Sequence, residues 1–171
     1  PVIVASHDVG NNPAGVEFDG TRIWVANSGD DTVSVLTASD GTLVATVAVG
    51  DSPGKILFDG QSLWVLNTGD GTVTKLAAET QEVLGTYTVG TTPNDISFDG
   101  KYIWVANTAA NSISVLSHTD GTLVDTISLD GPPYFLQFDG LGTWVATKET
   151  QSVVALQGGV LAGERWFVTR Y

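Results

Sequence analysis

Short stretches rich in β-branched and aromatic residues alternate with polar turn segments along the whole chain, and no stretch has a helical period. Near the start of the chain, residues 13–18, 22–27, 32–36 and 43–47 are such stretches, and Gly, Asp, Asn and Ser separate them. Runs of this length between turn residues are typical of β-strands. The pattern therefore predicts four short strands and an all-β fold.

The four-strand pattern recurs with a constant period. Trp24 is followed by Trp64, Trp104 and Trp144, a step of 40 residues each time. A fixed period of this length indicates one supersecondary unit copied along the chain. We therefore expect a single β-propeller domain over residues 1–171. Its four-stranded blades are expected at about 9–48, 49–88, 89–128 and 129–171, with residues 1–8 as an orphan outer strand.

The second stretch of each copy is apolar on both faces. Ile23 and Val25 point to one side of the expected strand, and Trp24 and Ala26 point to the other. Such a strand must be covered on both sides, and blades stacked around an axis provide this cover. We expect the four repeat tryptophans to be buried packing residues, each contributing roughly 1.5–3 kcal/mol.

The two ends of the chain leave the number of blades in the ring open. Both the orphan strand at residues 1–8 and a stretch at 163–168 look like outer strands, which makes five candidates for four blades. One alternative is a closed four-bladed ring, and the other is half of a larger ring completed by another chain. An open half would expose two apolar sheet faces, which favours a partner. In the divergent fourth copy, the candidates for a contact surface are Tyr134, Phe135, Trp166 and Phe167.

The repeat resembles a known family. The succession V-G-x-x-P, F-D-G, I-W-V-A-N, T-V-S-V-L and D-G-T-L-V looks like the YVTN-type β-propeller repeat, which is related to the NHL and virginiamycin B lyase-like propellers. The resemblance covers all four copies, essentially the whole chain. It implies a β-propeller and is specific for the blade, but it implies little about activity.

One face of the expected propeller collects two sets of loops, those that lead into the first strand and those that join the second and third strands. Polar groups gathered over an axial opening make this face the default binding site. Calcium requires six to eight oxygen ligands, and no Asp-x-Asp-x-Asp-Gly loop is present. We expect solvated loops and no metal or cofactor. The binding-face candidates are Asn11, Asn12, Asp30, Asp31, Asp51, Asp70, Asn94 and Asp95.

Catalytic motifs are missing from the sequence. His7 and His118 are the only imidazoles, and no Gly-x-Ser-x-Gly or His-Glu metal motif occurs. Virginiamycin B lyase-like relatives use a His/Glu constellation, and no positions of this chain match it. The sequence therefore predicts a protein that is not an enzyme.

Charge and composition disfavour some classes of binding partner and some locations. The net charge is −12 with only seven basic residues, which disfavours nucleic acid. The lack of a long apolar run predicts no membrane insertion, and the first ten residues do not look like a signal peptide. The absence of Cys and Met favours an extracellular or particle-surface protein.

The function expected from the sequence is a non-enzymatic, structural binding or assembly module. Its partner is expected to be another protein or a second copy of the chain. The first alternative is a propeller that binds a small ligand or a glycan. The second is a metal-dependent lyase- or lactonase-like enzyme.

Overall fold

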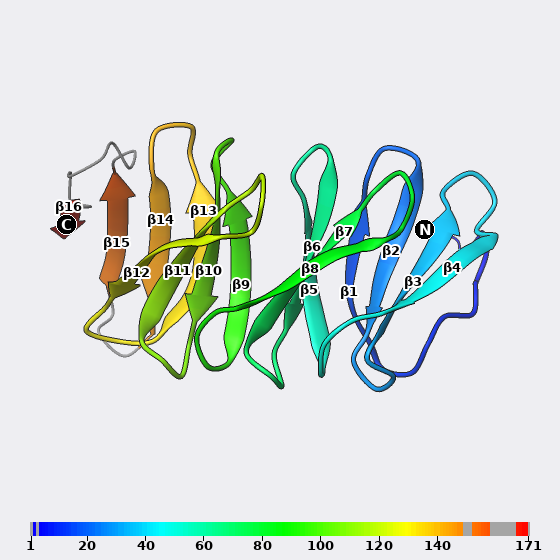
Figure 1. The fold of residues 1–171 in the computed structure, drawn as a ribbon, viewed down its shortest axis with the longest axis horizontal. Coiled ribbons are helices and arrows are strands. Elements are labelled where there is room, and N and C mark those ends of the chain that lie inside the picture. The colour runs from blue at the N-terminus through cyan, green and yellow to red at the C-terminus, as the bar shows by residue number, and fades with distance from the viewer. Residues whose placement is uncertain (1, 3, 149–151, 158–166, 171) are drawn as a thin grey trace. The chain divides into compact units, whose positions relative to one another are not determined.

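The computed structural model describes residue 2 and residues 4–148, 152–157 and 167–170, and every regular element within them is a strand (Figure 1). No helix that could cross a bilayer occurs in this part of the chain. The all-β prediction is therefore confirmed. The strands are β1 (Pro13–Phe18), β2 (Arg22–Asn27), β3 (Thr32–Thr37), β4 (Leu43–Ala48), β5 (Pro53–Phe58), β6 (Ser62–Asn67), β7 (Thr72–Ala77), β8 (Val83–Thr88), β9 (Pro93–Phe98), β10 (Tyr102–Asn107), β11 (Ser112–Ser117), β12 (Leu123–Ser128), β13 (Pro133–Phe138), β14 (Thr143–Thr147), β15 (Ser152–Gln157) and β16 (Phe167–Arg170).

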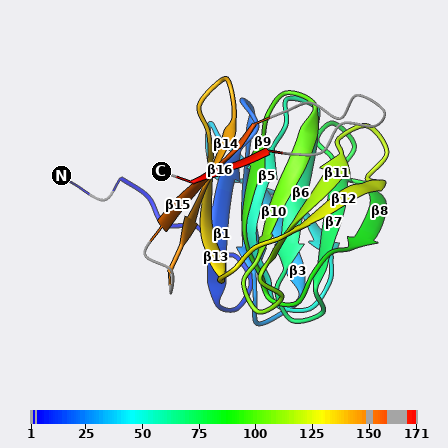
Figure 2. The same ribbon diagram turned by 90° about the vertical axis from the view of Figure 1, so that its left-hand side faces the viewer.

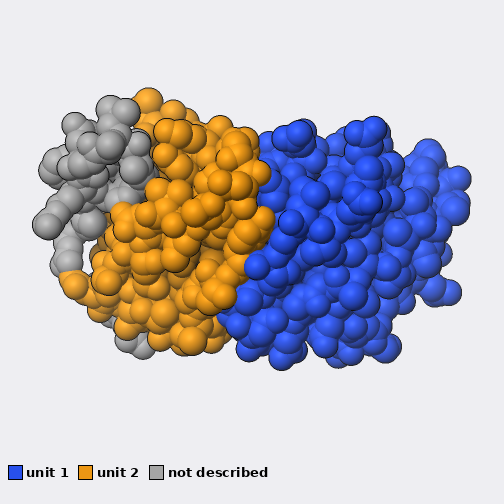
Figure 3. Space-filling model, in the orientation of Figure 1, with its two compact units in different colours: residues 1–86 blue, residues 87–171 orange. Residues whose placement is uncertain are grey.

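The strands form four sheets of four, each made of consecutive strands in chain order. The chain is thus built from four propeller blades, as the 40-residue period predicts. It divides into two compact units, residues 1–86 and 87–171, which are coloured separately in Figure 3. Unit one holds the first and second blades and unit two the third and fourth, with the boundary inside β8.

The strand register explains why both faces of each blade are apolar. In the first blade Val16 lies opposite Val25, and Glu17 lies opposite Trp24. Paired residues share a face of the sheet. We call the face that carries Trp24, Ala26, Val33 and Val35 the trailing face of the first blade. The opposite, leading face carries Val16, Ile23, Val25 and Leu36.

Three of the four repeat tryptophans are buried. Trp24 and Trp64 are 0% exposed and Trp104 is 2% exposed. Trp144 is only half-buried. It lies on the trailing face of the fourth blade, and within unit two no other sheet packs against that face. Burial of the indole therefore depends on a neighbouring blade and not on the repeat sequence alone.

The orphan outer strand is expected at residues 1–8, of which the structure describes residues 2 and 4–8. The described residues of that stretch have no regular secondary structure. Every sheet already takes its fourth strand from its own repeat, and β16 fills this place beside β15 in the fourth blade (Figure 2). The stretch instead reaches the outer turn of the first blade, where a Cβ on Gly41 would meet the ring of His7.

Candidate functional site

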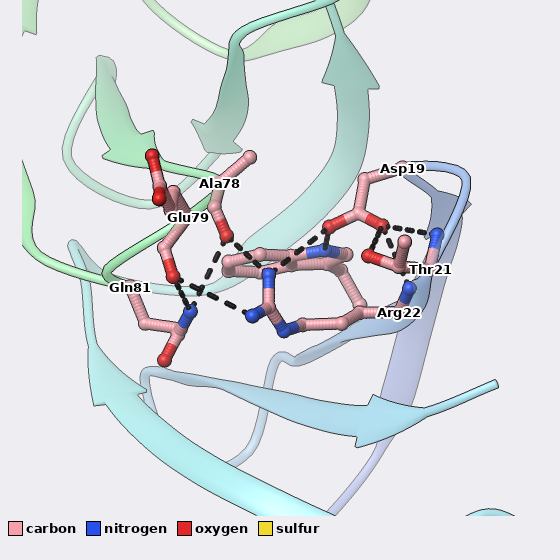
Figure 4. Close-up of polar contacts among 7 residues, drawn as sticks. Asp19, Thr21, Arg22, Ala78, Glu79 and Gln81 are labelled. Atoms are coloured by element: carbon pink, nitrogen blue, oxygen red, sulfur yellow. Dashed lines mark hydrogen bonds and ion pairs between the residues drawn. The ribbon is translucent and has the colours of Figure 1, made fainter.

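The Asp of each Phe-Asp-Gly turn connects the turn to the repeat tryptophan. In the first blade, Asp19 Oδ1 accepts hydrogen bonds from the N–H groups of Thr21 and Arg22 at 2.8 and 2.7 Å. Asp19 Oδ2 accepts the indole N–H of Trp24 at 2.8 Å (Figure 4). The indole bond recurs in Trp64–Asp59, Trp104–Asp99 and Trp144–Asp139 at 2.7–2.8 Å. From the sequence, the Asp is expected only to form the turn. Its second role, accepting the indole N–H, is signalled by the constant separation of five residues between Asp and Trp.

These contacts shift the acidity of the turn. Burial tends to raise the pKa of Asp19, but the hydrogen bonds from Trp24 and the turn N–H groups outweigh it and lower the pKa below 3.8. Arg22 lies beside this carboxylate, with Nη1 at 3.9 Å from Oδ2. The same guanidinium donates to the Ala78 carbonyl at 2.7 Å, so it connects the two blades of unit one (Figure 4).

The Asn that ends the second strand is a structural residue. Asn27 is 0% exposed. Its Oδ1 accepts the Gly10 N–H at 3.1 Å, and its Nδ2 donates to Thr32 Oγ1 and Ser34 Oγ at 3.1 and 2.9 Å. The side chain thus holds together the loop and two strands. Asn107 makes the same contacts with Gly90, Ser112 and Ser114, whereas Asn67 binds Thr72 and Thr74 through Nδ2 but leaves its Oδ1 without a partner.

The two sets of loops meet in the first blade, as the topology predicts. The N–H groups of Ser28 and Gly29 donate to the carbonyls of Asn12 and Asn11 at 3.0 and 3.1 Å. Asp30 accepts the backbone and side-chain N–H groups of Asn11 at 2.6 and 2.7 Å. These bonds lower the pKa of Asp30. Asp30 and Asn11 therefore fasten one loop to the other.

In the second blade, an acidic residue again accepts hydrogen bonds that connect the loops. Asp70 Oδ2 accepts the Asp51 N–H at 3.2 Å, and Asp70 Oδ1 accepts the Thr72 hydroxyl at 2.6 Å. Asp31 of the first blade accepts the Ser52 N–H at 2.9 Å, which connects neighbouring blades of unit one. No group of three or more acidic or imidazole side chains close enough to hold a metal ion occurs among the described residues.

In unit two, the predicted pair Asn94 and Asp95 lies at the junction between blades. Asn94 Nδ2 donates to the Tyr134 carbonyl at 2.8 Å. Asp95, expected on the binding face, is instead 3% exposed. Its Oδ2 accepts the N–H of Leu136 in the fourth blade at 2.7 Å. Asp95 faces the next blade because its position in the first strand lies on the trailing face, so a ligand over the loops would not reach its carboxylate.

An apolar hollow of about 360 Å³ lies on the fourth blade, lined by Tyr134, Phe135, Ala146, Thr147 and Lys148. The ring of Phe135 is 65% exposed and its centre lies 6.5 Å from that of Tyr134. Lys148 Nζ lies 5.1 Å from the centre of the Tyr134 ring, within reach of a cation–π contact. Two of the four residues predicted as a contact surface thus line this hollow.

The other two predicted contact residues give no information about this hollow. Trp166 lies outside the described residues, and Phe167 begins β16 without a described side chain. The aromatic pair at Tyr134 and Phe135 was visible in the sequence, but the hollow beside it was not. It depends on Ala146 and Thr147, which come from a different strand.

Each imidazole lies beside one group of the described chain. The ring of His7 lies against Gly41. The ring of His118 lies 5.3 Å from that of Phe98. Neither contact assembles a nucleophile with a base.

Comparisons with known proteins support the propeller fold and nothing finer. No protein-family model and no curated protein matches the chain. Among solved structures it is similar to a computationally designed protein, Ika4 (16% identity, 89% of this chain and 94% of that chain, TM-score 0.77). It is also similar to a streptogramin B lyase (17% identity, 95% and 55%, TM-score 0.76). Hydrazine synthase of Kuenenia stuttgartiensis is a further match (21% identity, 99% and 53%, TM-score 0.74). The chain thus spans about half the length of these natural proteins.

Proposed function

We propose that this chain is a non-enzymatic β-propeller module of the YVTN type that binds a protein partner or assembles with further copies of itself. One observation carries the proposal. The recurring polar side chains, Asp19 and Asn27 and their counterparts, are engaged in hydrogen bonds within their own blades. These polar side chains therefore stabilise the scaffold. A partner would bind to the loops and the blade faces.

The proposed setting is extracellular or at the surface of a particle. A chain without Cys or Met has no thiol or thioether to oxidise. A net charge of −12 discourages nonspecific contact with nucleic acid and anionic surfaces. Both properties suit an exposed structural protein.

Glycan binding is the alternative, and the hollow on the fourth blade favours it. The exposed face of Phe135 offers an apolar platform for a sugar ring, and Lys148 at its edge offers a donor. A glycan array would test this alternative. Binding that Phe135→Ala abolishes and Leu84→Ala leaves intact would support it, and a blank array would remove it.

A lyase- or lactonase-like enzyme is the second alternative. It draws on the printed names of structural neighbours, a streptogramin B lyase and a putative 6-phosphogluconolactonase, at 17–20% identity. Folds of this kind carry many unrelated functions, so the analogy is weak.

The experiment that separates the module from an enzyme is a titration with Mg²⁺, Ca²⁺, Mn²⁺ and Zn²⁺ followed by calorimetry, with lyase and lactonase assays on the same samples. The proposed module gives no stoichiometric metal binding and no turnover. Metal-dependent turnover that a chelator abolishes would contradict the proposal.

A further inference from the structure

Within each unit, neighbouring blades join in the same way. In unit one, Trp24, Val33 and Val35 on the trailing face of the first blade form one core cluster with the leading face of the second blade. That leading face contributes Ile56, Leu63, Val65 and Leu76. In unit two, the corresponding cluster joins Trp104, Ala106, Ile113 and Val115 to Leu136, Val145, Val154 and Leu156. A trailing face is thus the natural cover of a leading face.

Among the described strands of unit one, no sheet covers the leading face of the first blade. Val16 is 67% exposed, whereas its counterparts Ile56 and Leu136 are 3% and 6% exposed. Ile23 and Val25 on the same face are only half-buried. The difference lies in the neighbour and not in the residue type, because all these side chains are branched aliphatics.

Among the described strands of unit two, no sheet covers the trailing face of the fourth blade, which is the complementary face. Val153 is 46% exposed, whereas its counterparts Val33 and Ile113 are 0% exposed. Trp144 and Ala146 on this face are half-buried. These residues repeat the set Trp24, Ala26 and Val33 that covers a leading face in unit one.

Phe135 is the side chain of this trailing face that differs from its counterparts in the other blades. Phe135 occupies the same register position as Gly15 and Asp95 in their blades. Both of those residues contact the first strand of the next blade. In unit one the contact is made with Gly54, and the residue 40 positions earlier is Ala14. The first blade carries the small residues Ala14 and Gly15 at the corresponding place, and Asp95 in unit two shows that this register position accepts a side chain.

We infer that the trailing face of the fourth blade docks onto the leading face of the first blade in a second copy of this chain. The docking forms a head-to-tail pair with two equivalent junctions. The inference rests on the proposed assembly function and names its partner. Closed association of this kind satisfies both open faces at once.

Light scattering coupled to size exclusion tests the pair. The 171-residue chain should have twice the mass of one 17.9 kDa copy. Val16→Asp and Phe135→Asp should each reduce it to one copy, because each places a carboxylate in an apolar junction. Both side chains are more than three-fifths exposed, so unchanged circular dichroism is expected. Leu84→Asp, with the same added charge on a 52% exposed side chain of β8, should keep the double mass.

Mixing the two variants tests the head-to-tail direction. Val16→Asp retains an intact trailing face and Phe135→Asp retains an intact leading face, so an equimolar mixture should recover a mixed pair through one intact junction. A wild-type mass of one copy, or of more than two, overturns the inference. A double mass that survives either variant, or a mixture that stays at one copy, overturns it as well. The metal titration described above would be unaffected by any of these results, so the two proposals fail separately.

Discussion

At the scale of single residues, the bond between the turn carboxylate and the indole connects local structure to the core. Asp59 Oδ2 accepts the N–H of Trp64 at 2.8 Å while Oδ1 accepts the N–H groups of Gln61 and Ser62. A buried indole N–H needs a partner. The carboxylate supplies it from the turn, so the turn is positioned by the same side chain that permits the tryptophan to be buried.

The first prediction concerns this bond. Asp59→Ala should lower the free energy of unfolding by about 1–3 kcal/mol, because it leaves the indole N–H of a fully buried Trp64 without an acceptor. Urea unfolding monitored by Trp fluorescence measures the loss. Asp40→Ala is the control, because Asp40 accepts the Thr42 N–H in an exposed turn and binds no indole. Equal losses in the two variants would show that the indole bond has no separate effect.

The second prediction concerns acid. Hydrogen bonds lower the pKa of Asp19, Asp30, Asp40, Asp120 and Asp139 below their ordinary value of 3.8. A lowered pKa in the folded state means that the unfolded chain binds protons first as the pH falls. Stability from these groups should therefore be complete well above pH 3.8 and be lost as the pH falls through the lowered values. Urea midpoints measured between pH 7 and pH 2 check this, and a midpoint that rises below pH 4 would contradict it.

At the scale of elements, the first strand of each blade is placed by what fits between two sheets. A Cβ on Gly15 would lie 2.1 Å from the Gly54 carbonyl oxygen in the next blade. The two strands can approach so closely because Gly15 carries no side chain. In unit two the same register position carries Asp95, which replaces close contact with a hydrogen bond to Leu136.

The third prediction compares two glycines. Gly15→Ala should destabilise the fold by more than Gly20→Ala, because its new methyl group meets backbone that a rotamer change cannot move. Gly20 has φ +99 with nothing within 4 Å of an added Cβ, so its variant measures backbone strain alone, on the order of 1–2 kcal/mol. Thermal unfolding of both variants gives the comparison. A smaller loss for Gly15→Ala would mean that the sheets separate at little cost.

At the scale of the whole molecule, charge opposes the association that the apolar faces favour. Two copies each carry a net charge of −12. The Debye length falls from about 30 Å at 0.01 M salt to about 8 Å at 0.15 M. Repulsion between copies therefore weakens over the range of salt in which apolar burial changes little.

The fourth prediction follows from this opposition. The dissociation constant of the proposed pair should fall when NaCl is raised from 10 to 150 mM at pH 7. Sedimentation equilibrium at several loading concentrations measures the change. Dissociation promoted by salt would show that ion pairs, and not apolar faces, hold the copies together.

Local signals sufficed for the blade. The strand from Arg22 to Asn27 is apolar on both faces, and the turn at Asp19-Gly20 follows a β-prone stretch, so the position of each strand could be predicted. The roles of particular polar residues could not. Asp30 and Asp95 look alike in the sequence, yet one fastens exposed loops and the other is buried against the next blade.

The sequence by itself determined the repeating four-stranded unit, because strand alternation and turn chemistry act over a few residues. Tertiary structure alone decided which side chains are covered. The same repeat buries Trp24 completely and Trp144 only by half. The described residues among 1–8 likewise have no regular secondary structure, and every sheet already has its fourth strand. Burial and strand pairing depend on neighbours distant along the chain, so no local pattern encodes them.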